Sequence, residues 1–166
     1  MSRKLSILLP ILVVGLALDQ VTKVLVMQKL PLGSQTPLIP DILNLVHIHN
    51  KGAAFGLLSG WSTQFTWLFF VITTALVLAV LGYMLWRLPD GHWTATLGYS
   101  LVLTGALGNL IDRVRLGKVV DFIDVYWGRY HWPAFNVADS LVCLGAAVLV
   151  WVIIREENPA DASNPV

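Results

Sequence analysis

Charged residues are scarce in this chain. Asp, Glu, Lys and Arg together make up 13% of its 166 residues, whereas an ordinary soluble domain contains about 25%. Hydrophobic residues make up 56%, which is far too many for an intrinsically disordered chain. The chain therefore lacks the charge needed to cover a water-facing surface, and its composition predicts a small integral membrane protein.

Two further features are missing, namely a basic surplus and a second cysteine. Eleven basic residues against ten acidic ones leave a net charge of +1, so we expect no nucleic-acid partner. The single cysteine, Cys143, cannot form an intramolecular disulfide and has no thiolate partners for a metal site.

Long apolar segments are what the chain has instead. A membrane-spanning helix needs about 20 predominantly apolar residues, and four segments approach or exceed that length: about 5–27, 64–86, 93–111 and 137–154. The first segment follows Met-Ser-Arg-Lys, as the apolar part of a cleaved signal peptide would. Its apolar character resumes after Lys23 and gives a full crossing, so we expect this segment to be retained.

The connecting segments are long on one side of the membrane. They cover residues 28–63 and 112–136. Within them, Asn44–His49 and Val119–Trp127 contain the β-branched and aromatic residues that favour strands. The sequence therefore predicts an all-α integral membrane protein with one domain of four transmembrane helices. A small extracytoplasmic cap containing short β-strands completes the predicted fold.

The basic residues give conflicting signals about orientation. Arg3 and Lys4 precede the first span and favour a cytoplasmic N-terminus. Four crossings then place the loose polar tail, residues 156–166, on the same side. However, the opposite side carries six basic residues and the cytoplasmic side only four. We follow the N-terminal charges and predict that both termini are cytoplasmic, which leaves the outer basic residues in need of a local cause.

The polar residues of the spans converge at one depth. In a chain that crosses four times, the ends of spans one and three share a membrane face with the starts of spans two and four. The polar residues at those ends are Asp19, Lys23, Asn109, Asp112, Arg113, Asn136, Asp139 and Ser140. A charge inside the bilayer costs roughly 2.5–3.5 kcal/mol, and function is the default explanation for it. We therefore expect a functional site near the outer face.

Several chemistries can be weighed against this set of residues. The chain contains neither His-Glu-x-x-His nor Gly-x-Ser-x-Gly, the motifs of zinc proteases and serine hydrolases. Ser140 and Lys23 make only a weak candidate for a Ser–Lys pair. His47 and His49 alternate on a predicted strand but lack a third ligand, so we expect no metal and no other cofactor.

Two carboxylates remain for hydrolytic chemistry. Asp121 lies in the outer loop, and Asp139 opens the fourth span 18 residues later. If the loop folds back onto the bundle, the two face each other and hold one proton between them. Such a pair supplies an acid and a base together, which amide hydrolysis by activated water requires. Asp124 points away from Asp121 if this segment is a strand and competes with it if the segment is a helix.

Simpler explanations stay open for some of these residues. Asp19 and Lys23 are four residues apart and can form an ion pair that lowers the insertion cost. Asn109 can act as a hydrogen-bonding contact between helices. The rival function is a small proton-coupled transporter or channel, but the second span and the cytoplasmic halves of the other spans contain no ionisable residue to continue a path across the membrane.

Five motifs together resemble a known family. In order, they are Asp19–Lys23 (DQVTK), Asn50–Gly56 (NKGAAFG), Gly105–Arg113 (GALGNLIDR), Val119–Phe122 (VVDF) and Phe135–Ser140 (FNVADS). Their order and spacing resemble those of the bacterial lipoprotein signal peptidases (signal peptidase II), which are aspartic peptidases of the cytoplasmic (inner) membrane. The resemblance covers nearly the whole chain.

The resemblance implies a function and a set of site residues. Members of this family cleave the signal peptide of prolipoproteins just before a diacylglyceryl-modified cysteine, near the outer face of the membrane. The implied partners are such lipidated prolipoproteins, membrane lipid and globomycin-type inhibitors. The implied catalytic residues are Asp121 and Asp139. The residues implied to bind substrate or support this pair are Asp19, Lys23, Asn50, Gly52, Asn109, Arg113 and Asn136.

Overall fold

Four long helices and a small sheet form the structure. The computed structural model describes residues 3–52 and 62–156. The helices are α1 (Arg3–Lys29), α2 (Thr63–Arg87), α3 (Trp93–Leu116) and α4 (Val137–Glu156). All four are long and apolar enough to cross a membrane. The strands are β1 (Gln35–Ile39), β2 (Leu43–Asn50), β3 (Val119–Trp127) and β4 (Tyr130–His131). The predicted fold class is therefore confirmed.

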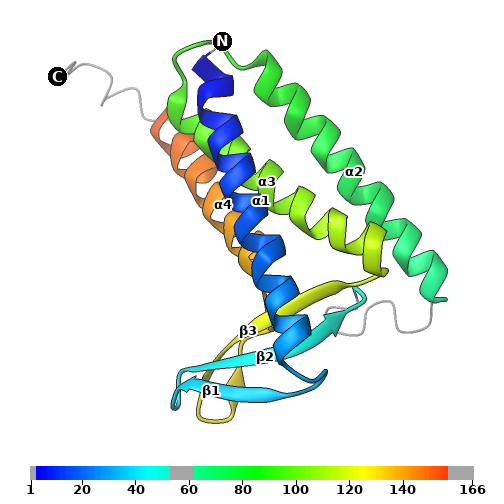
Figure 1. Ribbon diagram of the computed structural model, residues 1–166. Coiled ribbons are helices and arrows are strands. Elements are labelled where there is room, and N and C mark those ends of the chain that lie inside the picture. Colours follow the sequence, from blue (N-terminus) through cyan, green and yellow to red (C-terminus); the bar gives the residue numbers. More distant parts are fainter. Residues whose placement is uncertain (1–2, 53–61, 157–166) are drawn as a thin grey trace.

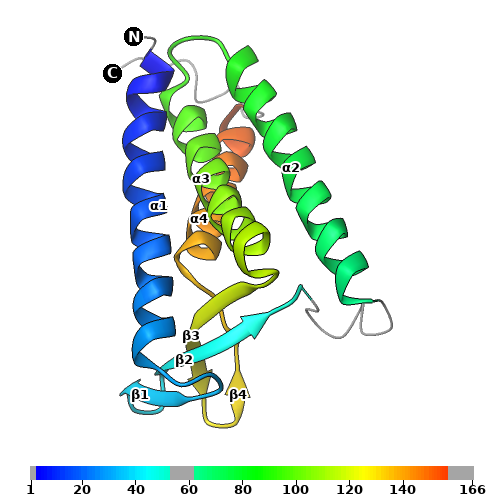
Figure 2. The ribbon, with the colours of Figure 1, turned by 45° about the vertical axis from the view of Figure 1, so that its right-hand side comes forward.

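Helix α3 holds the bundle together, because it contacts each of the other three helices. The sheet lies at one end of the bundle, and the start of α1 and the end of α4 lie at the other (Figures 1 and 2). Glycines allow α3 and α4 to approach closely. A Cβ atom on Gly105 would overlap the carbonyl oxygen of Ala138, and one on Gly145 would lie 2.7 Å from the oxygen of Gly98. Small residues at such contacts are typical of membrane helices.

The outer faces of the helices are apolar and exposed, as a lipid environment requires. On α2, large exposed side chains such as Ile72, Leu76 and Val80 cover the surface. Such a continuous apolar surface would be unfavourable in water, and it fits four helices surrounded by hydrocarbon.

The sheet is antiparallel, with the strand order β1-β2-β3-β4. Strands β2 and β3 match the two predicted strand segments. Strands β1 and β4 were not predicted; β1 contains Pro37 and is exposed along its whole length, so no alternation of apolar and polar residues marks it. In the pairing of β2 with β3, Asn50 lies opposite Val119 and Ile48 lies opposite Asp121. This register brings the end of β2 next to the start of β3.

Helix α3 ends later than the predicted third span. The loop was expected to begin at residue 112, but α3 continues to Leu116 and ends at Gly117, whose φ of 72° suits only glycine without strain. The helix thus extends five residues beyond the predicted membrane span, 93–111. Asp112 and Arg113 lie on the helix because their side chains have partners in the bundle, described below.

A small apolar core fixes β3 against the helices. Val26 in the last turns of α1 packs with Val120 and Phe122. Since side chains alternate along a strand, burying Val120 and Phe122 against α1 turns the intervening Asp121 to the other face. This places its carboxylate toward the beginning of α4.

Candidate active site

Asn136 connects the two carboxylates that the sequence singled out. It lies just before α4 and is 0% exposed. Its side-chain Nδ2 donates to Oδ1 of Asp121 at 2.8 Å, and its backbone N–H donates to Oδ2 of Asp139 at 3.2 Å. The backbone N–H of Asp139 donates back to Oδ1 of Asn136 at 2.9 Å, a reciprocal helix cap. Asp121 from β3 and Asp139 from α4 are thus held on either side of one residue.

Each carboxylate also accepts a hydrogen bond from a second amide. Nδ2 of Asn50, at the end of β2, donates to Oδ2 of Asp121 at 3.0 Å. Nδ2 of Asn109 on α3 donates to Oδ1 of Asp139 at 2.8 Å. Asp121 is 2% exposed, whereas Asp139 is only half-buried. The two carboxylates therefore have similar donors but different contact with solvent.

The pKa of the Asp121 carboxyl is raised from 3.8 to about 6, mainly by burial and also by the nearby negative charge of Asp139. The hydrogen bonds from Asn50 and Asn136 and the charge of Lys23 act in the opposite direction, because they stabilise the ionised form. Asp121 can thus keep a proton in mildly acidic conditions while it lies beside a second carboxyl group, that of Asp139. This is the arrangement that an acid–base pair needs.

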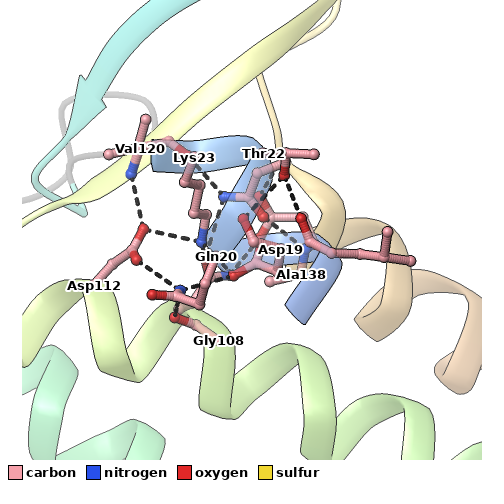
Figure 3. A network of polar contacts seen from close by, with 12 residues as sticks. Asp19, Gln20, Thr22, Lys23, Gly108, Asp112, Val120 and Ala138 are labelled. Atoms are coloured by element: carbon pink, nitrogen blue, oxygen red, sulfur yellow. Dashed lines mark hydrogen bonds and ion pairs between the residues drawn. The ribbon is translucent and has the colours of Figure 1, made fainter. Parts of the chain in front are cut away.

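Lys23 of α1 is the centre of a buried charge network (Figure 3), which reaches Asp139 through Asn109. It is 1% exposed. Its Nζ lies 2.9 Å from Oδ2 of Asp19 and 2.9 Å from Oδ2 of Asp112, and it donates to Oδ1 of Asn109 at 3.1 Å. The last bond orients the Asn109 amide so that its Nδ2 points to Asp139. The i,i+4 ion pair predicted for Asp19 and Lys23 is present, but it is one part of a larger network.

The two acidic partners of Lys23 each hold the backbone next to a candidate catalytic residue. Oδ1 of Asp19 accepts from the N–H of Ala138 at 2.9 Å, just before Asp139. Oδ2 of Asp112 accepts from the N–H of Val120 at 3.2 Å, just before Asp121. Figure 3 shows both carboxylates turned toward these backbone groups. Lys23 thereby couples the positions of β3 and α4.

Gln20 belongs to the same network, although the sequence analysis did not select it. Its Nε2 donates to Oδ2 of Asp19 at 3.1 Å and to Oδ1 of Asp112 at 3.0 Å, so it joins the two carboxylates a second time, beside Lys23 (Figure 3). The available signal was its place within the DQVTK motif. Its neutral amide carries none of the insertion cost that drew attention to the charged residues.

The remaining predicted site residues, Gly52 and Arg113, contact the asparagines that bond to the pair. The N–H of Gly52 donates to Oδ1 of Asn50 at 2.8 Å, which turns Nδ2 of Asn50 toward Asp121. Nη1 of Arg113 donates to the carbonyl oxygen of Asn109 at 3.3 Å. The part of the NKGAAFG motif from residue 53 to 56, like the expected tail beyond residue 156, lies outside the described residues.

Alternative chemistries receive little support from the geometry. Oγ of Ser140 donates to the carbonyl oxygen of Asn136 at 3.0 Å, and Nζ of Lys23 contacts Asp19 and Asp112 instead of Ser140, so a Ser–Lys pair is not assembled. Nε2 of His47 lies 3.1 Å from Nε2 of His49, but residues 3–52 and 62–156 contain no group of three His, Cys, Asp or Glu that fits a metal ion.

Asp124 is separate from the pair. It lies on β3 and accepts hydrogen bonds from Nδ2 of Asn44 at 2.8 Å and from Nδ1 of His131 at 2.9 Å. This arrangement agrees with the strand geometry considered in the sequence analysis, in which Asp124 points away from Asp121.

No path of charges continues through the bundle. Within the described part of the chain, the buried charged residues are Asp19, Lys23, Asp112, Asp121 and Asp124, and all lie at the sheet end. Farther along α3 the buried polar groups are the hydroxyls of Thr96, Ser100 and Thr104, and each donates to the carbonyl oxygen four residues earlier. These hydroxyl groups form their hydrogen bonds within α3. The geometry therefore favours a site at one membrane face over a transport path.

Comparisons with known proteins identify the family. The family described as signal peptidase (SPase) II matches residues 11–155. The lipoprotein signal peptidase of Geobacter metallireducens is 44% identical over 91% of this chain and 92% of its own length. That of Geobacter sulfurreducens is 45% identical over 87% of this chain and 89% of its own length.

Solved structures agree with the sequence relatives. A bacterial membrane enzyme determined by the in meso method at 1.9 Å resolution is 36% identical, with a TM-score of 0.78 over 87% of this chain and 90% of that chain. A second such structure, at 2.3 Å, is 35% identical with the same TM-score. The chain therefore belongs to the signal peptidase II family of bacterial multi-pass membrane proteins, and it is an aspartic peptidase.

Proposed function

We propose that this lipoprotein signal peptidase cleaves its substrates just before a diacylglyceryl-modified cysteine, using a water molecule activated between Asp121 and Asp139. The observation that carries the proposal is the shared partner, Asn136, which donates to both carboxylates. Two carboxylates held this way, one of them buried enough to have a pKa of about 6, form the acid–base pair of an aspartic peptidase.

The chemical steps follow from the difference in burial. Asp121, the more buried carboxyl, holds the proton, and Asp139 carries the negative charge. Asp139 takes a proton from water as the water oxygen attacks the scissile carbonyl carbon, while Asp121 gives its proton to the carbonyl oxygen. In the collapse of the tetrahedral intermediate, Asp139 gives its proton to the leaving amine and Asp121 recovers its own. No acyl-enzyme forms, because the nucleophile is water.

The surrounding residues keep this pair in place. Asn50, Asn109 and Asn136 fix the carboxylates, and Lys23 with Asp19 and Asp112 fixes the backbone that carries them. Arg113 and Gly52 lie beside these asparagines, and the peptide backbone of the substrate approaches there in this proposal. Arg113 is the one residue of this set with a guanidinium group to bind substrate oxygens.

The N-terminal charges and the four crossings support a site at the outer face of the bacterial inner membrane. With the N-terminal charges in the cytoplasm, the start of α1 and the end of α4 are both cytoplasmic, and the sheet with the carboxylate pair is at the outer face. A substrate anchored by acyl chains in the outer leaflet then reaches the pair without leaving the membrane. Globomycin-type inhibitors would occupy the same space.

Lipid modification of the substrate should control the rate. We expect kcat/KM for an unmodified precursor to be at least about 100-fold below that of the diacylglyceryl-modified form, since each buried CH₂ of an acyl chain is worth about 0.8 kcal/mol. The measurement compares the two precursors, identical in sequence, with purified enzyme in detergent. Comparable cleavage of both would contradict the proposed substrate class while leaving the carboxylate chemistry in place.

A further inference from the structure

Helix α2 contacts the candidate active site through two aromatic residues. Nε1 of Trp67 donates to the carbonyl oxygen of Arg113 at 2.6 Å. One turn later, the ring of Phe70 lies beneath the guanidinium of Arg113, 5.4 Å from the ring centroid to Cζ. Both aromatic side chains are partly buried, whereas their neighbours Leu68 and Phe69 are exposed. This face of α2 is thus distinct from its lipid-facing surface.

The ring of Phe70 also contacts the turn that carries Asn50. A Cβ atom built on Gly52 would overlap the Phe70 ring, so only glycine allows the turn to approach this closely. Gly52 has a φ of 90° and orients Asn50 through its N–H, and Asn50 in turn donates to Asp121. Phe70 therefore lies between the turn on one side and Arg113 on the other.

The carboxylates of Asp139, Asp121 and Asp112 attract the guanidinium of Arg113, but few directional contacts set its orientation. Within the described residues its guanidinium makes one hydrogen bond, at 3.3 Å, to the carbonyl oxygen of Asn109 on its own helix. That bond ties one nitrogen to α3 but does not set the plane of the group. The aromatic face of Phe70 does set it, because a guanidinium prefers to lie over an electron-rich ring.

We propose that Phe70 is a positioning residue for the peptidase reaction. Its ring orients the guanidinium of Arg113 and supports the Asn50–Gly52 turn, while Trp67 fixes the backbone of Arg113. The inference rests on the proposed function, because it assigns Arg113 and Asn50 their roles beside Asp121 and Asp139. It gives α2, which supplies no charged residue to the network, a specific part in the site.

The test measures kcat/KM of Phe70→Leu, Phe70→Met and Phe70→Tyr in the wild-type and Arg113→Lys backgrounds. Phe70→Leu should lower kcat/KM roughly 10-fold in the wild-type background, and Phe70→Tyr, which keeps the ring, should restore most of it. In the Arg113→Lys background, Phe70→Leu should lower kcat/KM by roughly threefold or less, because the effects of two substitutions that act through one group are not additive. Single-turnover assays at high enzyme concentration cover the slow variants. Leu76→Ala, at a position of the same helix that is 63% exposed, is the matched control and should behave as wild type.

Two results would overturn the inference: normal activity of Phe70→Leu, or an equal loss in both backgrounds. If Phe70→Leu lowers the thermal midpoint, Phe70→Met decides instead, since it keeps most of the side-chain volume but removes the ring. Asp121→Asn and Asp139→Asn are assayed alongside. Activity in those variants would contradict the proposed function, whereas normal Phe70→Leu with inactive Asp variants would contradict this inference alone.

Discussion

Asp121→Asn and Asp139→Asn should each lower turnover of a lipidated precursor by at least roughly 10³-fold. An amide can neither take the proton of the attacking water nor return a proton to the carbonyl oxygen, and proton transfer of this kind is worth about 10²–10⁴ in rate for each group. Because the two carboxylates act as one pair joined by Asn136, the double variant should be no slower than either single variant. Single-turnover cleavage in detergent measures all three.

Asp124→Asn is the matched control for this experiment. Asp124 is on the same strand as Asp121 and is also buried, at 6% exposure, but it bonds to Asn44 and His131. Its replacement should leave kcat close to that of the wild type. Normal turnover by either Asp121→Asn or Asp139→Asn, with the protein folded, would show that the acid–base pair is wrongly assigned. A comparable loss in Asp124→Asn would move the chemistry to the other face of β3.

The second large effect is on stability. Lys23→Met should lower the free energy of unfolding by roughly 3–5 kcal/mol, which is the usual cost of removing one partner from a buried ion pair. Without the ammonium, Asp19 and Asp112 remain buried and unneutralised, and both still hold backbone N–H groups next to the site. Thermal unfolding in detergent measures the loss.

Lys29→Met provides the matched comparison, because Lys29 is on the same helix but exposed at its end. We expect little change in its thermal midpoint. Adding Asp19→Asn to Lys23→Met should recover part of the lost stability, since it removes one of the uncompensated charges. If Lys23→Met unfolds at the same temperature as the wild type, the network in Figure 3 does not carry the stability assigned to it.

The convergence of the polar residues was predictable from the chain because it depends on the number of crossings alone. Four spans force the ends of α1 and α3 and the start of α4 to one face, and the charges of Asp19, Asp112 and Asp139 mark where that face is. Burial of charge is costly enough that its position in the sequence is informative. The two longest strands were predictable for a similar reason, since β-branched residues are concentrated in them.

Other parts of the site left no comparable signal. The run from Asp112 to Arg115 looks like the start of a loop, yet it continues α3 because Lys23 and Gln20 satisfy Asp112. Phe70 is an apolar residue in an apolar span, so the sequence around it does not distinguish a contact with Arg113 from a contact with lipid. Both features depend on partners that are distant in the chain, which local pattern cannot reveal.

The most direct test of the central claim is the titration of the Asp121 carboxyl. Carbon NMR of protein with labelled aspartate monitors the titration, and the signal that is missing in Asp121→Asn is assigned to Asp121. In the wild type it should titrate near pH 6. In Asp139→Asn the titration should move to lower pH, because a neighbouring negative charge is gone, while burial keeps it above 3.8. An unchanged titration in Asp139→Asn would mean that the two carboxylates do not share a site.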